Sequence, residues 1–393
     1  FGGLLIEWPE AGVARSFEVH GSDDGNAWTL LRRVSNARGA KNHLALPGSE
    51  TRFLRLTFSD AAAASLHRLH LKPDAFSRLP NEFIHHVAAD FPRGWFPRYW
   101  HREQSYWTVV GTPEGGRRAL INEEGLIETD EGAFSIEPFI VTDGGLLTWA
   151  DVSTRIALPE DGEPMPSVEW RAEGLKLEIL PWLRGSGRDL ELAVKYRLQC
   201  DRPHAGARLV LALRPFQVTP PWQAFRNMGG RANLQKIECG ANGVVADGKQ
   251  VSFSPPASRI GAATFDEGGV LADLAENQMP QSARVDDESG LASAAIEWAL
   301  APGETTLEVT IRVPYFENTA PAPEISRDDA MREWQRVLGG VGWQVSDAAK
   351  GAIATLRTAG AQILINRDGA ALQPGARRYT RSNATMRHWP PTT

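Results

Sequence analysis

The segment 91–107, FPRGWFPRYWHREQSYW, gathers the side chains of this chain that are best suited to ligand binding. It holds seven aromatic residues and three arginines in 17 positions, whereas aromatic residues make up 8% of the whole chain. Flat rings stack on sugar rings, and guanidinium forks donate paired hydrogen bonds to hydroxyls. The same residue types are enriched at interfaces. The segment is therefore predicted to form a seam between domains, or a seam that also contacts a ligand.

A second candidate for ligand contact is the PPWQ stretch at 220–223. Its two prolines stiffen a loop that follows a predicted strand, and a stiff loop can hold Trp222 outward at low entropic cost, with Gln223 beside it. Most tryptophan rings are largely buried, so a packing role for Trp222 is the alternative.

Glycosidic cleavage requires two carboxyl groups that are roughly 5–9.5 Å apart. Runs of adjacent carboxylates do not meet that need by their spacing, and they are predicted to be turn and cap residues instead: Asp23-Asp24, Glu123-Glu124 and Asp286-Asp287-Glu288. Glu103 and Glu137 are expected to form salt bridges with nearby arginines. No catalytic residue is assigned.

Other functional classes receive little support from the sequence. Histidines 67, 70, 85 and 86 fit no metal-ligand spacing, and we expect neither a metal nor a cofactor. Cys200 and Cys239 are predicted to be small hydrophobic residues in strands. The net charge of −6 gives no reason to expect nucleic acid as a partner. No stretch approaches the ~20 apolar residues of a membrane span.

These side chains must be positioned by a structure that is predicted to be mainly β. Between residues 4 and 71, short segments with alternating apolar and polar residues are separated by turn signals such as DDGN at 23–26, which indicates an antiparallel sandwich. About nine further strand-like segments between 106 and 316 imply a second, larger two-sheet structure. Helix starts at Ser326 and Ser346 predict helices that end near Leu338 and Ile365.

The first region resembles the latter half of a discoidin, or coagulation-factor type C, domain. The resemblance rests on IEW at 6–8, FEV at 17–19, SDDGNAW at 22–28, RFLRL at 52–56 and LHL at 69–71. If only half of such a sandwich is present, an edge and part of its core should be uncovered.

The rest of the chain resembles the N-terminal region of bacterial discoidin-domain proteins with a glucoamylase-like module, in which a β-supersandwich precedes an (α/α)6 barrel of six helical hairpins. The motifs are FPRGWFPRY at 91–99, EQSYWTVVG at 103–111, SIEPF at 135–139, RPFQ at 214–217, PPWQ at 220–223 and PGARRYTRS at 374–382. The implied domains are a partial discoidin-like sandwich (1–74), a connector (75–90), a supersandwich (91–320), a helical linker (321–370) and the truncated start of the barrel (371–393).

This resemblance implies that the parent protein is a glycosidase or glycoside phosphorylase with carbohydrate as its partner. The substrate-binding residues that it suggests are Arg98, Tyr99, Trp107, Trp222, Gln223, Arg378, Tyr379 and Arg381. In the family, R-S is typically followed by W-I-R-D, whose Arg/Asp pair binds sugar hydroxyls. Here Asn383 follows Arg381-Ser382 directly. We therefore expect a fragment without its barrel domain and without catalytic carboxylates. The alternative is a non-catalytic carbohydrate-binding or adhesion module.

Overall fold

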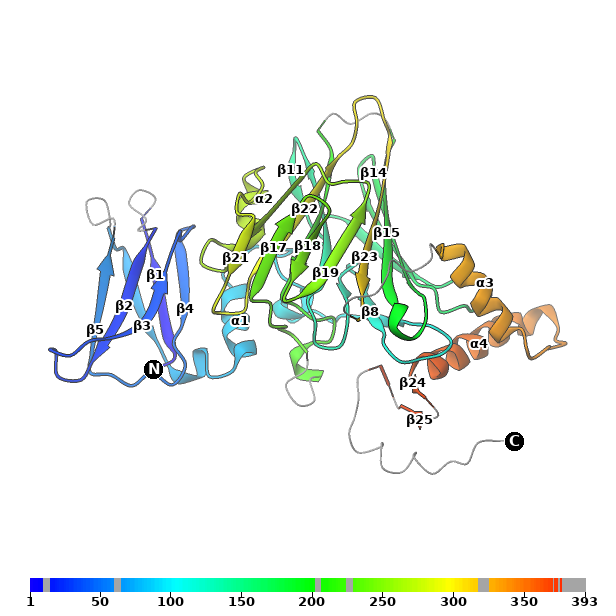
Figure 1. Cartoon of the computed structure of the whole chain (residues 1–393), viewed down its shortest axis with the longest axis horizontal. Coiled ribbons are helices and arrows are strands. Elements are labelled where there is room, and N and C mark those ends of the chain that lie inside the picture. The colour runs from blue at the N-terminus through cyan, green and yellow to red at the C-terminus, as the bar shows by residue number, and fades with distance from the viewer. Residues whose placement is uncertain are drawn as a thin grey trace.

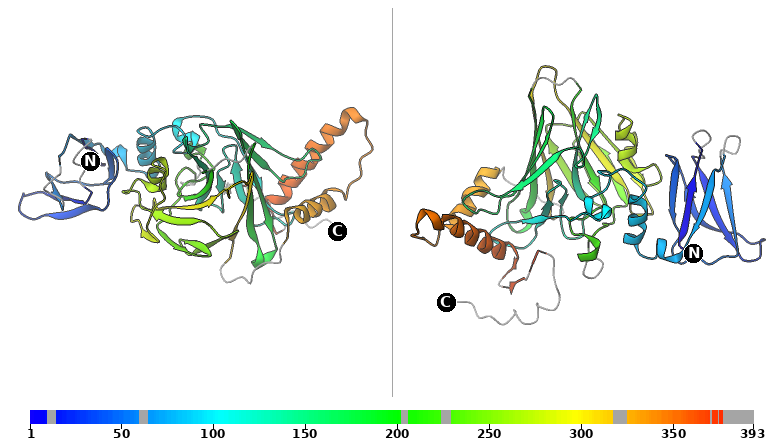
Figure 2. Two further views of the ribbon diagram at one scale, coloured as in Figure 1. Left: turned by 90° about the horizontal axis from the view of Figure 1, so that it is seen from above. Right: turned by 180° about the vertical axis from the view of Figure 1, so that it is seen from behind.

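A computed structural model shows the architecture of the chain. It describes residues 1–9, 15–59, 65–201, 206–223, 229–316, 325–369, 371–373 and 375–376. Figures 1 and 2 show a small β-sandwich at one end of an elongated molecule, a large β-sandwich in the middle and two helices at the opposite end. The predicted mainly β fold with a short helical region near the C-terminus is confirmed.

The small sandwich consists of two three-stranded antiparallel sheets. One sheet has the order β4 (Lys41–Ala45), β1 (Gly3–Glu7), β6 (Arg68–Lys72), and the other has the order β3 (Thr29–Val34), β2 (Phe17–Ser22), β5 (Phe53–Phe58). Alternation places Leu4 and Ile6 of β1 against Phe17 and Val19 of β2, and all four side chains are buried. Trp8 closes this core, and its indole donates a hydrogen bond to Asn42.

The core of the small sandwich is open along strand β6. In the antiparallel register, Leu69 lies opposite Ile6 and Leu71 lies opposite Leu4, so these leucines share the inner face of the sheet. They are nevertheless 38% and 60% exposed, respectively. Strand β6 is therefore an edge strand with two leucines of its inner face partly accessible.

The large sandwich stacks two antiparallel sheets around the largest hydrophobic core. One sheet has nine strands in the order β12 (Ser153–Ala157), β13 (Ser167–Ala172), β14 (Leu175–Arg184), β15 (Glu191–Cys200), β23 (Thr306–Pro314), β19 (Lys249–Ser254), β18 (Gly243–Ala246), β17 (Lys236–Gly240), β21 (Arg284–Asp286). The other has the order β20 (Arg259–Ala263), β22 (Ser293–Ala299), β16 (Arg208–Arg214), β10 (Ser135–Thr142), β9 (Ile127–Glu128), β8 (Ala119–Asn122), β7 (Trp107–Val110), with β11 (Gly145–Leu147) paired to β10.

Strand β15 illustrates why these segments form half-buried strands. Leu192, Val194 and Tyr196 point into the core between the sheets, while Lys195 and Arg197 alternate with them and are only partly buried. Cys200 ends this strand, and Cys239 lies in β17, so both cysteines occupy strands as predicted.

In the described part of the chain, four α-helices cover parts of the sandwiches. Helix α1 (Pro80–Ala88) and helix α2 (Gly269–Ala275) lie between the small and the large sandwich, and helices α3 (Arg327–Leu338) and α4 (Lys350–Ile365) lie at the far end, followed by the short hairpin β24 (Arg367–Asp368) and β25 (Ala371–Leu372). Ser326 caps α3 as predicted: its hydroxyl accepts a hydrogen bond from the Asp329 amide, and the Asp329 carboxylate accepts one from the Ser326 amide. None of the described helices is long and apolar enough to cross a membrane.

Candidate functional site

The aromatic and arginine-rich segment 91–107 lies between helix α1 and strand β7, and most of its rings are packed against other elements. Phe96, Tyr99 and Trp100 belong to a buried cluster that also contains residues of α1, β7, β8, β14, β15, α3 and α4. Gly94 has a φ of +99°, and a Cβ atom there would collide with Thr148. Only glycine allows the segment to turn this close to the large sandwich. The segment is therefore a seam, in agreement with the first sequence-based interpretation.

Arg98 is committed to two carboxylates of the large sandwich. Its Nε donates to Glu124 at 2.7 Å, its Nη1 donates to Glu123 at 2.7 Å, and its guanidinium lies 5.0 Å from the centre of the Trp149 ring. Glu124 is fully enclosed, and this burial raises the pKa of its carboxyl from 4.5 to about 7, although the Arg98 charge and hydrogen bonds oppose the rise. Arg98 therefore anchors the segment.

Tyr99 is buried beneath the loop that carries Trp222. Its hydroxyl donates to the backbone carbonyls of Gln217 at 2.8 Å and Gly230 at 3.1 Å, and burial raises its pKa well above the usual value. The ring of Trp222 meets the ring of Tyr99 edge to face, with 6.1 Å between their centres. Trp222 itself is 56% exposed, and Gln223 beside it is also exposed. The predicted residues thus form a buried anchor and an accessible ring above it.

Of the other predicted binding residues that the structure describes, Trp107 takes no part in the contact between Tyr99 and Trp222. Trp107 is half-buried in β7, where it lies opposite Asn122 of β8. Arg378, Tyr379 and Arg381 lie outside the described residues. The structure brings Tyr99 and Trp222 into contact, whereas Arg98 pairs with Glu123 and Glu124 instead.

The carboxylates in the family-like motifs form the ion pairs that were expected. Glu103 binds Arg93 with two hydrogen bonds of 2.6 and 2.8 Å, and these bonds hold the pKa of Glu103 below its usual value. Glu137 binds Arg214 at 2.7 Å, and both side chains are buried. Within the described part of the chain, no group of three or more His, Cys, Asp and Glu residues could hold a metal ion.

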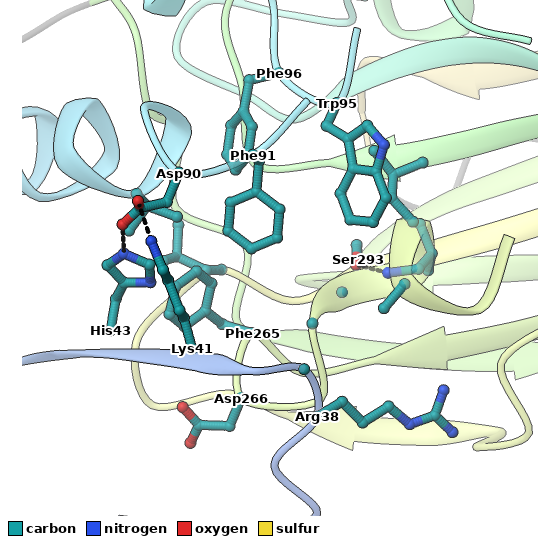
Figure 3. A pocket seen from close by; sticks show the side chains of 18 of the residues that line it. Arg38, Lys41, His43, Asp90, Phe91, Trp95, Phe96, Phe265, Asp266 and Ser293 are labelled. Carbon is teal, nitrogen blue, oxygen red and sulfur yellow. Dashed lines mark hydrogen bonds and ion pairs between the residues drawn. The ribbon is translucent and has the colours of Figure 1, made fainter. Parts of the chain in front are cut away.

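A cavity of about 470 Å³ lies between the small sandwich, the start of the 91–107 segment and helix α2. Figure 3 shows the rings of Phe91, Trp95, Phe96 and Phe265 around it. Phe91 and Trp95 stack with 5.4 Å between ring centres and 28° between their planes. The volume is within the range of known ligand pockets, which is about 300–1,000 Å³.

Ion pairs across the seam surround this cavity. Lys41 and His43 of β4 reach Asp90 at 2.6 and 2.8 Å. Burial lowers the pKa of His43 below 6.5, more than the Asp90 carboxylate raises it, so the His43–Asp90 contact is a neutral-imidazole hydrogen bond at neutral pH. Arg38 also pairs with Asp273 of α2.

Only part of this second site was predictable from the sequence. The cluster at 91–107 pointed to Phe91, Trp95 and Phe96, but the residues from β4, α2 and the loop before α2 have no motif and meet only in the folded chain. An Arg38–Gly39–Ala40–Lys41 stretch carries no pattern that would mark it as the mouth of a pocket.

No family model matches the sequence, and no curated protein sequence matches it either. Solved structures similar to this chain include a bacterial glucoamylase complexed with acarbose, with 11% identity, a TM-score of 0.39 and coverage of 64% of this chain and 36% of the other. They also include a GH92 family glycosyl hydrolase, with 13% identity, a TM-score of 0.38 and coverage of 67% and 39%. A GH92 α-mannosidase from Bacteroides thetaiotaomicron has 12% identity, a TM-score of 0.39 and coverage of 68% and 39%. The chain thus spans less than half the length of each.

Proposed function

We propose that this chain is the β-rich portion of a carbohydrate-active enzyme of the glycoside hydrolase type, with a discoidin-like small sandwich in front of it. The observation that supports this most directly is the order of elements: a large two-sheet sandwich is followed by the helices α3 and α4, which pack on it. This is the order implied by the motif resemblance. The family's arrangement would place a helical barrel beyond these helices.

The chemistry of the described residues favours binding over cleavage for this chain alone. Hydrolysis requires one carboxyl group that can donate a proton and a second that acts as base or nucleophile. Glu103, Glu123 and Glu137 each bind an arginine, and Glu124, whose pKa is about 7, is 2% exposed beneath Arg98. A substrate could not reach Glu124 without opening the seam. We expect the catalytic pair to come from elsewhere in the parent protein.

The exposed Trp222 and Gln223 are the surface that we assign to carbohydrate in this chain. The Trp222 ring is held from below by Tyr99, so a sugar ring would stack on a platform that is already ordered. Gln223 offers an amide donor and acceptor for hydroxyl groups at the edge of that platform. The same surface also supports the second candidate function, a non-catalytic carbohydrate-binding module.

Isothermal titration of the purified chain with a panel of α- and β-linked gluco- and manno-oligosaccharides tests this function. We expect binding that Trp222→Ala weakens about tenfold, since aromatic contacts contribute about 0.5–1.5 kcal/mol and 1.4 kcal/mol corresponds to tenfold. Trp343→Ala is the matched control, because Trp343 is similarly exposed at 51% but lies between α3 and α4.

Two results would contradict the proposal. One is the absence of binding to every member of the panel. The other is equal weakening by Trp222→Ala and Trp343→Ala. Turnover of a glycan by the purified chain, abolished by substitution of one described carboxylate, would instead show that catalysis resides in this chain.

A further inference from the structure

The cavity between the two sandwiches has an apolar interior. Its depth is lined by Phe96, Val270, Leu271 and Leu291, which are all buried. The half-buried rings of Phe91, Trp95 and Phe265 also line the cavity. A planar aromatic group placed here would meet rings on more than one side and would lose its contact with water.

Polar groups within the cavity already have partners in the protein. The Arg214 guanidinium donates to Glu137 at 2.7 Å and to the Trp95 carbonyl at 2.6 Å. The Ser293 hydroxyl accepts from the Val270 amide at 3.1 Å. A sugar carries a hydroxyl group on most of its carbons, and burial of hydroxyls without hydrogen bonds is costly. The interior therefore disfavours a sugar and favours an apolar ring.

Two cations at the cavity, Arg38 and Lys41, are more exposed than the carboxylates with which they pair. Lys41 and Arg38 are each 41% exposed at their side chains, whereas their partners Asp90 and Asp273 are 28% and 5% exposed. Asp266 also lies at the mouth, but it is paired with Arg32 at 2.9 Å and is 12% exposed. Glu276 is an exposed carboxylate that also lines the cavity, and its negative charge acts against the binding of an anion. The two exposed cations suit an anionic group that lies just outside the rings.

We propose that this cavity binds an aromatic carboxylate, with its ring against Phe91, Trp95 and Phe265 and its carboxylate at Lys41 and Arg38. The ligand would contact both sandwiches at once, because both cations come from the small sandwich (Lys41 from β4 and Arg38 from the loop before it) while Trp95, Phe265 and α2 belong to the other side of the seam. This site is separate from the Trp222 surface and does not depend on the proposed carbohydrate function.

Titration calorimetry with 2-naphthoate, on the full chain, tests the proposal. We expect one site per chain, and an affinity that falls as salt is raised from ~50 to ~500 mM because the charges at the mouth are partly solvated. The uncharged analogue 2-naphthalenemethanol should bind more weakly, and glucose and methyl mannoside should not compete.

Three variants locate the site. Lys41→Gln should weaken 2-naphthoate binding about 3- to 10-fold, which is the effect of losing one partly exposed charged contact. Phe91→Leu should weaken both naphthyl compounds, because it removes a ring but retains apolar bulk. Lys236→Gln, on β17 and exposed, is the matched control and should leave affinity unchanged.

The proposal is overturned if 2-naphthoate does not bind, if Lys41→Gln and Lys236→Gln bind it equally, or if a neutral sugar displaces it. Should Phe91→Leu fail to fold, the Lys41→Gln comparison and the uncharged analogue still decide the outcome. Failure of this test leaves oligosaccharide binding at Trp222 unaffected, so the two proposals are tested separately.

Discussion

Replacement of Glu124 by glutamine should change how the stability of the large sandwich depends on pH. Burial raises the pKa of this carboxyl from 4.5 to about 7 in the folded chain, and in the unfolded chain the pKa returns to its ordinary value. Between these two pH values the folded state binds more protons than the unfolded state, so the free energy of unfolding falls as pH rises. The stabilising contribution is complete below pH 4.5 and is lost above pH 7.

The size of the effect follows from the shift. At about 1.4 kcal/mol per pH unit, a rise from 4.5 to about 7 is worth about 3 kcal/mol. Roughly 2 to 3 kcal/mol of this should appear between pH 5 and pH 8, where urea unfolding can be followed by tryptophan fluorescence. Glu124→Gln keeps an acceptor for Arg98 but cannot ionise, so the variant should gain this amount relative to the unmodified chain as pH rises.

Glu103→Gln provides the control for this experiment. Glu103 lies in the same seam, but its pKa is lowered by hydrogen bonds from Arg93, so any contribution from it is lost only as pH falls below its usual range. Its stability difference should be flat between pH 5 and pH 8. The reasoning is refuted if the stability difference between Glu124→Gln and the unmodified chain does not change with pH, or if it grows toward acid pH.

Two further substitutions test the packing of the seam. Tyr99→Phe should lower the free energy of unfolding by about 1–3 kcal/mol, because it removes the hydroxyl that donates to the Gln217 carbonyl, whereas the Gly230 carbonyl still accepts from the Gln217 amide. Exposed Tyr106→Phe should have no effect, and equal losses in thermal unfolding would count against the anchor role. Arg214→Met should cost about 3–5 kcal/mol in urea unfolding, since it leaves Glu137 buried without its cation. Exposed Arg171→Met should cost far less, and a similar cost for both would contradict this account.

Local signals in the sequence predicted much of the fold. Alternating residues such as those of β15 indicated half-buried strands, and Ser326 with Asp329 marked the start of α3. Helix α1 was not predicted and lies within the expected connector. Its signal was available in retrospect: Pro80 occupies its first turn, and Phe83, Ile84 and Val87 form one buried face. Helix α2 begins at Gly268 and Gly269, residues that more often end a helix than start one.

The sites were less predictable, because they depend on contacts between distant segments. Salt bridges to an arginine were predicted for Glu103 and Glu137, but the partner of Glu137 was not identified, because Arg214 lies 77 residues away in the sequence. The exposure of Trp222 could not be decided from the prolines before it, because the same stiff loop can bury or present a ring. Three separate parts of the chain line the cavity: strand β4, the segment that follows α1, and helix α2. No local sequence pattern indicates that these three parts lie close together in the fold.

The seam between the sandwiches has a mechanical consequence. Its polar links from the small sandwich range from exposed to buried: Arg32–Asp266, Arg38–Asp273, Lys41–Asp90, His43–Asp90 and Asn36–Glu267. Each sandwich, in contrast, holds its shape through its own apolar core. Added salt weakens the links and leaves the cores intact. We therefore expect the junction between the sandwiches to respond to salt more than either core does, and the apolar cluster that joins Ala45 of β4 to Phe76 and Phe83 to limit that response.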